Sequence, residues 1–280
     1  SGLGDEDITL NDTTIAADSL NSINDDTTGT TGTVTLDGAT TIEGSADDLE
    51  TALTNADGTV GLDDIDVTVT SSTGTVDTGT LVAIIDITDG GTGVVSLDSS
   101  VTTLEGTEDE ATAIVSDYGN DYIDDTALSV NYVLTDNTVA VADIANIQDT
   151  VTGSITATVT ESTGQTLTDA NGVSLLTGTG NAFTITISET DDVLDADVLV
   201  QLAATTTETI TIEDNDSTEG DQTMSGTASN ILDVINGDFT GIEDDVAVTA
   251  SGNTSVANVN LLTAATSGAV TATVTETDVD

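Results

Sequence analysis

The stretch Asp66-Val67-Thr68-Val69-Thr70 alternates polar and apolar side chains with the period of two that is typical of a half-buried β-strand. About ten residues later, Leu81 and Ile84 form an apolar pair at helical spacing. After a turn containing glycine, the chain returns to a second strand-like run, Val94-Val95-Ser96. The local pattern therefore predicts a strand, a helix and a second strand.

This pattern recurs along the chain. The helical pairs begin at Leu20, Leu81, Ile144, Leu199 and Val259, which are separated by 61, 63, 55 and 60 residues. Strand-like runs precede the pairs at 7–10, 66–70, 128–132, 183–187 and 246–249. Further runs follow them at 34–36, 94–96, 155–157, 210–212 and 270–272. A period of about sixty residues is typical of a repeat protein.

A second helix is predicted in several repeats by its capping chemistry. Ser45 stands three residues before Asp48, and Thr107 three residues before Glu110, which is the arrangement of a capping box. Gly58 and Gly119 then occupy positions expected for C′ glycines. The apolar stripes of these helices are Leu49 with Leu53, Ala111 with Ile114 and Val115, and Ile231 with Val234 and Ile235.

These elements predict a β-rich α/β repeat protein. Each repeat contains strand, helix, strand and helix, or two strand–helix coils of about thirty residues. One coil cannot bury both faces of its strand, so we expect parallel pairing in an elongated solenoid or closely stacked array. The alternative is a string of small α+β or β-sandwich-like beads. The predicted repeats are 1–58, 59–119, 120–180 and 181–242, with a partial fifth repeat at 243–280.

The charge is extreme, because 52 Asp and Glu residues face no Lys, Arg or His and give a formal net charge of −52. Every surface carboxylate therefore meets only like charges. Bound divalent ions or a salty medium must supply the neutralisation. Nucleic acids and anionic membranes are excluded as partners, because their phosphates would meet no cation. We also expect no membrane insertion, because no stretch approaches the length of an apolar span.

Catalysis has few candidate groups. Without His, Cys or Lys, a reaction would depend on carboxylates, Tyr, Ser and Thr. A carboxylate pair could hydrolyse a glycoside, yet aromatic residues make up only 2% of the chain and basic residues are absent. We therefore expect no enzymatic activity. The absence of Cys also excludes disulfides and thiolate metal sites.

Calcium is the candidate ligand, because Ca²⁺ prefers oxygen ligands and binds weakly to many extracellular modules. Acid pairs recur just before predicted strands, and one loop is densely acidic. The candidate metal ligands are Asp63, Asp64, Asp124, Asp125, Asp214, Asp216, Asp244 and Asp245. The alternative is that these acids only solvate turns. The acidic loop that begins at Asp214 lacks the glycine at the sixth position of an EF-hand.

Four longer stretches carry a resemblance: Gly4–Leu10, Thr13–Ile23, Thr177–Ile187 and Ser267–Thr277. They resemble the tandem repeats of giant cell-surface proteins of marine cyanobacteria. The resemblance implies an extracellular or cell-surface location and a structural or adhesive role that can depend on calcium. It implies no catalytic residue.

Two functional hypotheses follow. The first is a structural component of an extracellular filament, sheath or cell-surface layer. The second is the spacer region of a giant calcium-dependent surface adhesin. The run Val270–Thr277 parallels Ile155–Ser162 but is not followed by the expected helix. We therefore expect the ends to contact copies of the chain or further repeats of the same chain, with assembly favoured by divalent ions.

Overall fold

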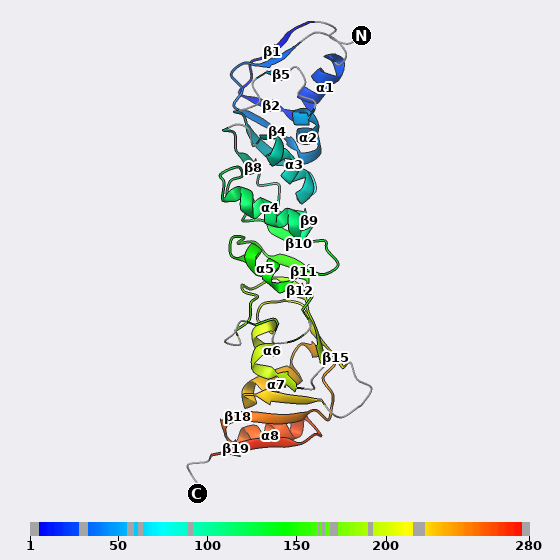
Figure 1. Ribbon diagram of the computed structural model, residues 1–280, viewed down its shortest axis with the longest axis vertical. Helices are drawn as coiled ribbons and strands as arrows, with labels where there is room; N and C mark the ends of the chain where they lie inside the picture. The colour runs from blue at the N-terminus through cyan, green and yellow to red at the C-terminus, as the bar shows by residue number, and fades with distance from the viewer. Residues whose placement is uncertain are drawn as a thin grey trace. The chain divides into compact units, whose positions relative to one another are not determined.

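The computed structural model shows an α/β protein with several parallel sheets (Figure 1). It describes residues 6–27, 33–54, 59–60, 64–88, 92–161, 163, 166–168, 173–189, 193–214 and 222–275, called the described residues below. The chain divides into two compact units. Unit 1 comprises Ser1–Asp136 and Asp149–Ile155, and unit 2 comprises Asn137–Gln148 and Thr156–Asp280.

Unit 1 contains three groups of parallel strands. The strands β1, β3 and β5 form one sheet, β2, β4, β6 and β8 form a second, and β7 pairs with β9, which pairs with β10. The elements are β1 (Ile8–Leu10), β2 (Thr14–Ala16), α1 (Ala17–Thr27), β3 (Val34–Leu36), β4 (Thr41–Ser45), α2 (Ala46–Thr54), β5 (Thr59–Val60), β6 (Asp66–Thr70), β7 (Thr75–Asp77), α3 (Thr78–Thr88), β8 (Val95–Leu97), β9 (Thr103–Gly106), α4 (Glu108–Tyr118) and β10 (Asn131–Leu134).

Unit 2 repeats this organisation. The strands β13, β15 and β17 form one sheet, β14, β16, β18 and β19 form another, and β11 pairs with β12. Only the first residue of β11 belongs to unit 1. The elements are α5 (Val141–Gln148), β11 (Ile155–Thr158), β12 (Ala182–Thr184), β13 (Thr186–Glu189), β14 (Val193–Asp195), α6 (Ala196–Ala203), β15 (Ile210–Asp214), β16 (Thr223–Gly226), α7 (Ala228–Asn236), β17 (Phe239–Thr240), β18 (Ala247–Thr254), α8 (Val256–Ala265) and β19 (Val270–Val274).

In unit 1 the helices follow one another about every thirty residues. In unit 1 the helices α1 to α4 begin at 17, 46, 78 and 108, so successive starts are 29, 32 and 30 residues apart. Residues paired across neighbouring strands are between 20 positions apart, as for Thr254 with Val274, and 30 positions apart, as for Val193 with Thr223. The expected parallel pairing is therefore confirmed, and we use the word coil for one such strand–helix segment.

Local sequence explains where helices begin. Thr107 caps α4, and its reciprocal hydrogen bonds with Glu110 form the predicted capping box. Ser45 accepts the N–H of Asp48 at 3.2 Å, as a capping box requires. The Asp48 carboxylate, however, accepts the Ser45 hydroxyl at 2.6 Å, whereas in a capping box it would accept the Ser45 backbone N–H. Gly119 has a φ of −62°, so the predicted left-handed C′ glycine is wrong there. Gly58 lies outside the described residues.

The core of each unit is mainly aliphatic. In β6, Val67 and Val69 are fully buried, and Thr68 between them is half-buried. The predicted helical pair Leu81 and Ile84 is also fully buried. Within the units, α1 packs on α2, α2 on α3 and α3 on α4, while α6 packs on α7 and α7 on α8 (Figure 1). Each coil therefore buries its apolar side chains against the next coil of the unit.

Two strand predictions need correction. The run 128–132 becomes a strand only from Asn131 onward, because Ala127 to Val130 form turns and bends. The run 183–187 is interrupted at Ile185 and is shared between β12 and β13. The pairing of β4 with β6 joins residues on both sides of the predicted boundary between repeats 1–58 and 59–119.

Candidate functional site

Carboxylates at strand starts hydrogen-bond to the following coil. Asp7 Oδ1 accepts the backbone N–H of Thr33 at 3.0 Å and the Thr33 hydroxyl at 2.8 Å, 26 residues later. Asp64 Oδ1 makes the same pair of contacts with Thr92, 28 residues later, at 3.3 and 3.1 Å. In a third instance, the side-chain oxygen of Asn131 accepts from Ser154. We call this arrangement the Asx clip.

The Asx clip has an electrostatic consequence at Asp7. The hydrogen bond from the Thr33 backbone, followed by that from its hydroxyl, lowers the pKa of Asp7 below 3.8. Hydrogen bonds from Ser100 lower the pKa of Asp98 in the same direction. Each of these bonds stabilises the ionised carboxylate. In a chain without a basic side chain, amide and hydroxyl groups thus supply the stabilisation that cations supply elsewhere.

Asp64 and Asp124 are candidate metal ligands that hydrogen-bond within the protein. Asp64 belongs to an Asx clip, as described above. Asp124 Oδ1 accepts the N–H of Thr126 at 3.0 Å and also the Thr126 hydroxyl. The Thr126 hydroxyl in turn accepts the N–H of Leu97 at 2.8 Å, which connects the turn to β8. Both carboxylates therefore hydrogen-bond to hydroxyl and amide groups of the protein, and their role as metal ligands stays a prediction.

The remaining described candidates are exposed. Asp125, Asp244 and Asp245 have exposed side chains. The backbone carbonyl of Asp244 accepts the N–H of Ser267 at 2.8 Å, so this turn contacts the loop before β19. Asp63 and Asp216 lie outside the described residues, as does the side chain of Asp214, the last residue of β15.

The described residues contain no group of three or more Asp, Glu, His or Cys that could hold a metal ion. The predicted acids therefore form pairs or single acceptors wherever their side chains are described. Calcium binding stays a prediction.

Other acids contact helix starts, and the sequence analysis missed them. Asp197 Oδ1 accepts the N–H of Thr227 at 2.9 Å and the side-chain amide of Asn230 at 2.7 Å, which joins α6 to α7. Asp136 accepts the N–H of Glu108 at 2.6 Å. A spacing of about 28 residues between an acid and a hydroxyl or helix start is the signal that could have revealed these contacts.

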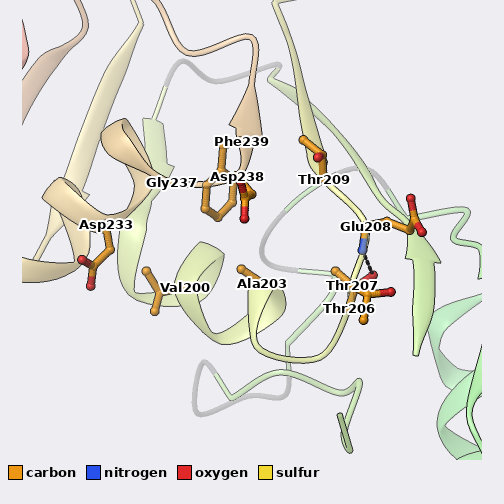
Figure 2. A pocket seen from close by; sticks show the side chains of 10 residues that line it. All are labelled: Val200, Ala203, Thr206, Thr207, Glu208, Thr209, Asp233, Gly237, Asp238 and Phe239. Carbon is orange, nitrogen blue, oxygen red and sulfur yellow. Dashed lines mark hydrogen bonds between the residues drawn. The ribbon is translucent and has the colours of Figure 1, made fainter. Parts of the chain in front are cut away.

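A pocket of about 230 Å³ lies in unit 2 between α6, α7 and the loop before β15 (Figure 2). Its lining includes Glu208, Asp233 and Asp238, whose side chains are exposed. Figure 2 shows Glu208 and Asp233 on opposite sides, with Asp238 and Phe239 between them. The lining offers carboxylates, threonine hydroxyls and apolar surface, and it contains no basic side chain.

No described helix has the length and apolar character required to cross a bilayer. The chain matches no protein-family model, and comparisons with curated proteins and with solved structures produced no match.

Proposed function

We propose that this protein is a non-enzymatic structural component of an extracellular filament, sheath or cell-surface layer. The observation that carries the proposal is the repeated parallel pairing of strands from successive coils, reinforced by Asx clips. In this proposal, the coils of each unit form a solenoid. Solenoids gain stability mainly from contacts between neighbouring coils, which suits an extended scaffold better than a catalytic centre.

The distribution of polar groups supports a structural role. In the described part of the chain, Asp7, Asp64 and Asp197 hydrogen-bond to backbone N–H groups one coil later. These acids therefore stabilise the contacts between coils. The pocket in unit 2 is lined by carboxylates, threonines and apolar residues, and its lining contains no His, Cys, Lys or Ser.

Divalent cations are part of this proposal because the chain has a formal net charge of −52. Ions that bind the folded state better than the unfolded state stabilise it by mass action. High ionic strength also weakens repulsion between exposed carboxylates. An extracellular, saline environment rich in calcium would meet both conditions, in agreement with the resemblance to surface proteins of marine cyanobacteria.

The partners in this proposal are copies of the chain or further repeats of the same chain. Electron microscopy of the purified protein tests it, with samples prepared in calcium, in calcium plus chelator and in concentrated NaCl. Filaments or sheets that form in calcium and disperse on chelation at low salt would support a structural subunit. Particles that remain single in every buffer would contradict self-assembly and favour the spacer of a calcium-dependent adhesin.

A further inference from the structure

The pocket in unit 2 lies at the C-terminal ends of two helices that pack on each other, α6 and α7. Its lining includes Val200 and Ala203 from the last turn of α6, and Asp233 with the following Gly237 from the end of α7. The C-terminal end of a helix carries a partial negative charge, which a nearby cation stabilises. Neither helix has a basic residue in its last turn, so a bound cation would be stabilised by both helix ends.

Three carboxylates add to the negative potential of the pocket. Figure 2 shows Asp238 and Phe239 in the middle, with Glu208 on one side and Asp233 on the other. The three acidic side chains are exposed, and no group of three acids in the described part of the chain could hold a metal ion. A ligand that contacts all three carboxylates must therefore extend over several atoms.

The pocket also has an apolar wall. Val200, Ala203 and Phe239 line it, and each is half-buried. The face of an aromatic ring attracts an ammonium group, and aliphatic side chains gain free energy by covering methylene groups. A strongly hydrated inorganic cation would gain little from this wall. The wall therefore favours a cation that carries its charge on a hydrocarbon chain.

Hydrogen bonds hold the loop on the Glu208 side of the pocket. The Thr206 hydroxyl accepts the N–H of Phe183 at 2.9 Å and donates to the Phe183 carbonyl at 3.0 Å. The Thr207 hydroxyl donates to the Asn181 carbonyl at 3.0 Å. The loop before β15 is thus fixed to residues 181–183.

The turn between α7 and β17 is fixed as well. A Cβ added to Gly237 would be 2.3 Å from the Asp233 carbonyl oxygen, so glycine permits the close approach of the chain at this turn. The next strand, β17, pairs with β15 through Phe239 and Ile210. Both sides of the pocket are therefore formed without a ligand, which reduces the entropic cost of binding one.

We propose that this pocket binds a linear aliphatic polyamine. An inner ammonium group contacts Asp238 and the Phe239 ring, while the methylene groups pack on Val200 and Ala203. The terminal ammonium groups reach the carboxylates on the two sides of the pocket. The ligand thus supplies positive charges that the chain itself lacks. The site is separate from the proposed structural role, so either proposal can fail without the other.

NMR titration of the full chain with spermidine, a linear triamine, tests the proposal. The titration is done in about 0.15 M NaCl, where the screening length is about 8 Å and diffuse attraction to distant acids is weak. We expect the amide signals of Thr207, Gly237 and Phe239 to shift together and to saturate with one ligand per chain. Hexaamminecobalt(III) is the matched ligand, because it has the same charge but no hydrocarbon chain. It should bind the pocket at least about fivefold more weakly.

Variants of the lining locate the site. Asp238→Asn should weaken spermidine binding about two- to fivefold, as expected for the loss of one exposed ion pair. Phe239→Leu, which keeps an apolar side chain but removes the ring, should weaken it by a similar factor. The control is Asp86→Asn, which removes one charge from an exposed position in the last turn of α3 in unit 1. It should leave binding unchanged, and unaltered amide signals elsewhere should show that each variant folds.

Three results would overturn the proposal. Shifts that spread over exposed acids of both units without saturating would show spermidine acting only as a diffuse counterion. Equal binding of hexaamminecobalt(III) at the pocket would remove the contribution of the apolar wall. Equal affinities in Asp238→Asn and Asp86→Asn would place the bound amine outside the pocket.

Discussion

Gly106 lies so close to Thr78 that a Cβ added to the glycine would be 2.7 Å from the Cβ of Thr78. Gly106 ends β9 and Thr78 begins α3, so this contact joins two successive coils. The added Cβ would also be 2.5 Å from Oε2 of Glu110, the oxygen that accepts the N–H of Thr107 at 2.7 Å. Glycine at this position therefore permits both the coil contact and the capping box of α4.

We expect Gly106→Ala to lower the free energy of unfolding of unit 1 by about 1–3 kcal/mol, because its methyl group overlaps Thr78 and Glu110. Tyrosine fluorescence during urea unfolding measures this, since the three tyrosines, Tyr118, Tyr122 and Tyr132, all belong to unit 1. The control is Gly119→Ala, whose φ of −62° suits alanine and whose nearest contact is the Ser116 carbonyl at 3.2 Å. Equal losses in both variants would contradict the overlap.

The Asx clip at Asp7 predicts a specific dependence on pH. Its hydrogen bonds with Thr33 keep the pKa of Asp7 below 3.8 in the folded protein. The stability that this clip contributes is therefore complete above pH 3.8 and is lost as the pH falls through the lower folded-state pKa. NMR titration of the Asp7 carboxyl carbon measures this value directly. In Thr33→Val, which keeps the backbone N–H, the pKa of Asp7 should rise toward 3.8. An unchanged pKa would show that the Thr33 hydroxyl does not stabilise the Asp7 carboxylate.

The burial of Tyr132 predicts that the folded protein loses stability as the pH rises. Its side chain is 1% exposed, and its hydroxyl donates to the Ala127 carbonyl at 3.0 Å. Burial raises the pKa of Tyr132 above its ordinary value of 10.0. Its contribution to stability is therefore complete below pH 10.0 and is lost as the pH rises toward the folded-state pKa. Tyr132→Phe should cost about 1–2 kcal/mol at neutral pH and make unit 1 less sensitive to alkali. Urea unfolding from neutral to alkaline pH checks both effects. If Tyr132→Phe loses stability at high pH as the original protein does, Tyr132 is not the group responsible.

Removal of divalent ions should lower the melting temperature markedly in low salt, because no basic side chain offsets the acids. Calorimetry with and without chelator measures the change, and NaCl should restore part of the loss.

The double variant Asp244→Asn with Asp245→Asn tests whether this pair forms a local calcium site. Its control is Asp25→Asn with Asp26→Asn, an exposed pair on α1. With diffuse binding, both double variants should reduce the calcium effect slightly and equally; a large loss in the first alone would establish a site at 244–245.

The eight helices of the described residues were predictable because each carries an apolar pair or a capping residue. Leu20 with Ile23, Leu81 with Ile84 and Leu199 with Leu202 all lie in helices as expected. The short strands before helices were missed. The run Thr41–Ser45, for example, contains Glu43 and Gly44, which weaken its alternating pattern, and its β-structure comes from pairing with β2 and β6. Local propensity could not reveal that pairing.

The site was harder to predict than the fold. The sequence identified acids at turns, but it could not show that one oxygen of Asp64 and of Asp124 already accepts two hydrogen bonds. Those contacts depend on which hydroxyl the next coil, or the next residues of a turn, places beside the carboxylate. The spacing of 28 between Asp64 and Thr92 follows from the length of one coil, whereas the sequence pattern emphasised sixty.

The Asx clips also affect the chemical durability of the protein. Their donors are backbone amides and hydroxyl groups, and the chain has no lysine amine, imidazole, guanidinium or thiol. Aldehydes, which cross-link lysines, and proteases that cleave after basic residues therefore find no side chain to attack. If the protein has the proposed structural role outside a cell, this composition should make it resistant to reactive carbonyl compounds and to trypsin-like enzymes.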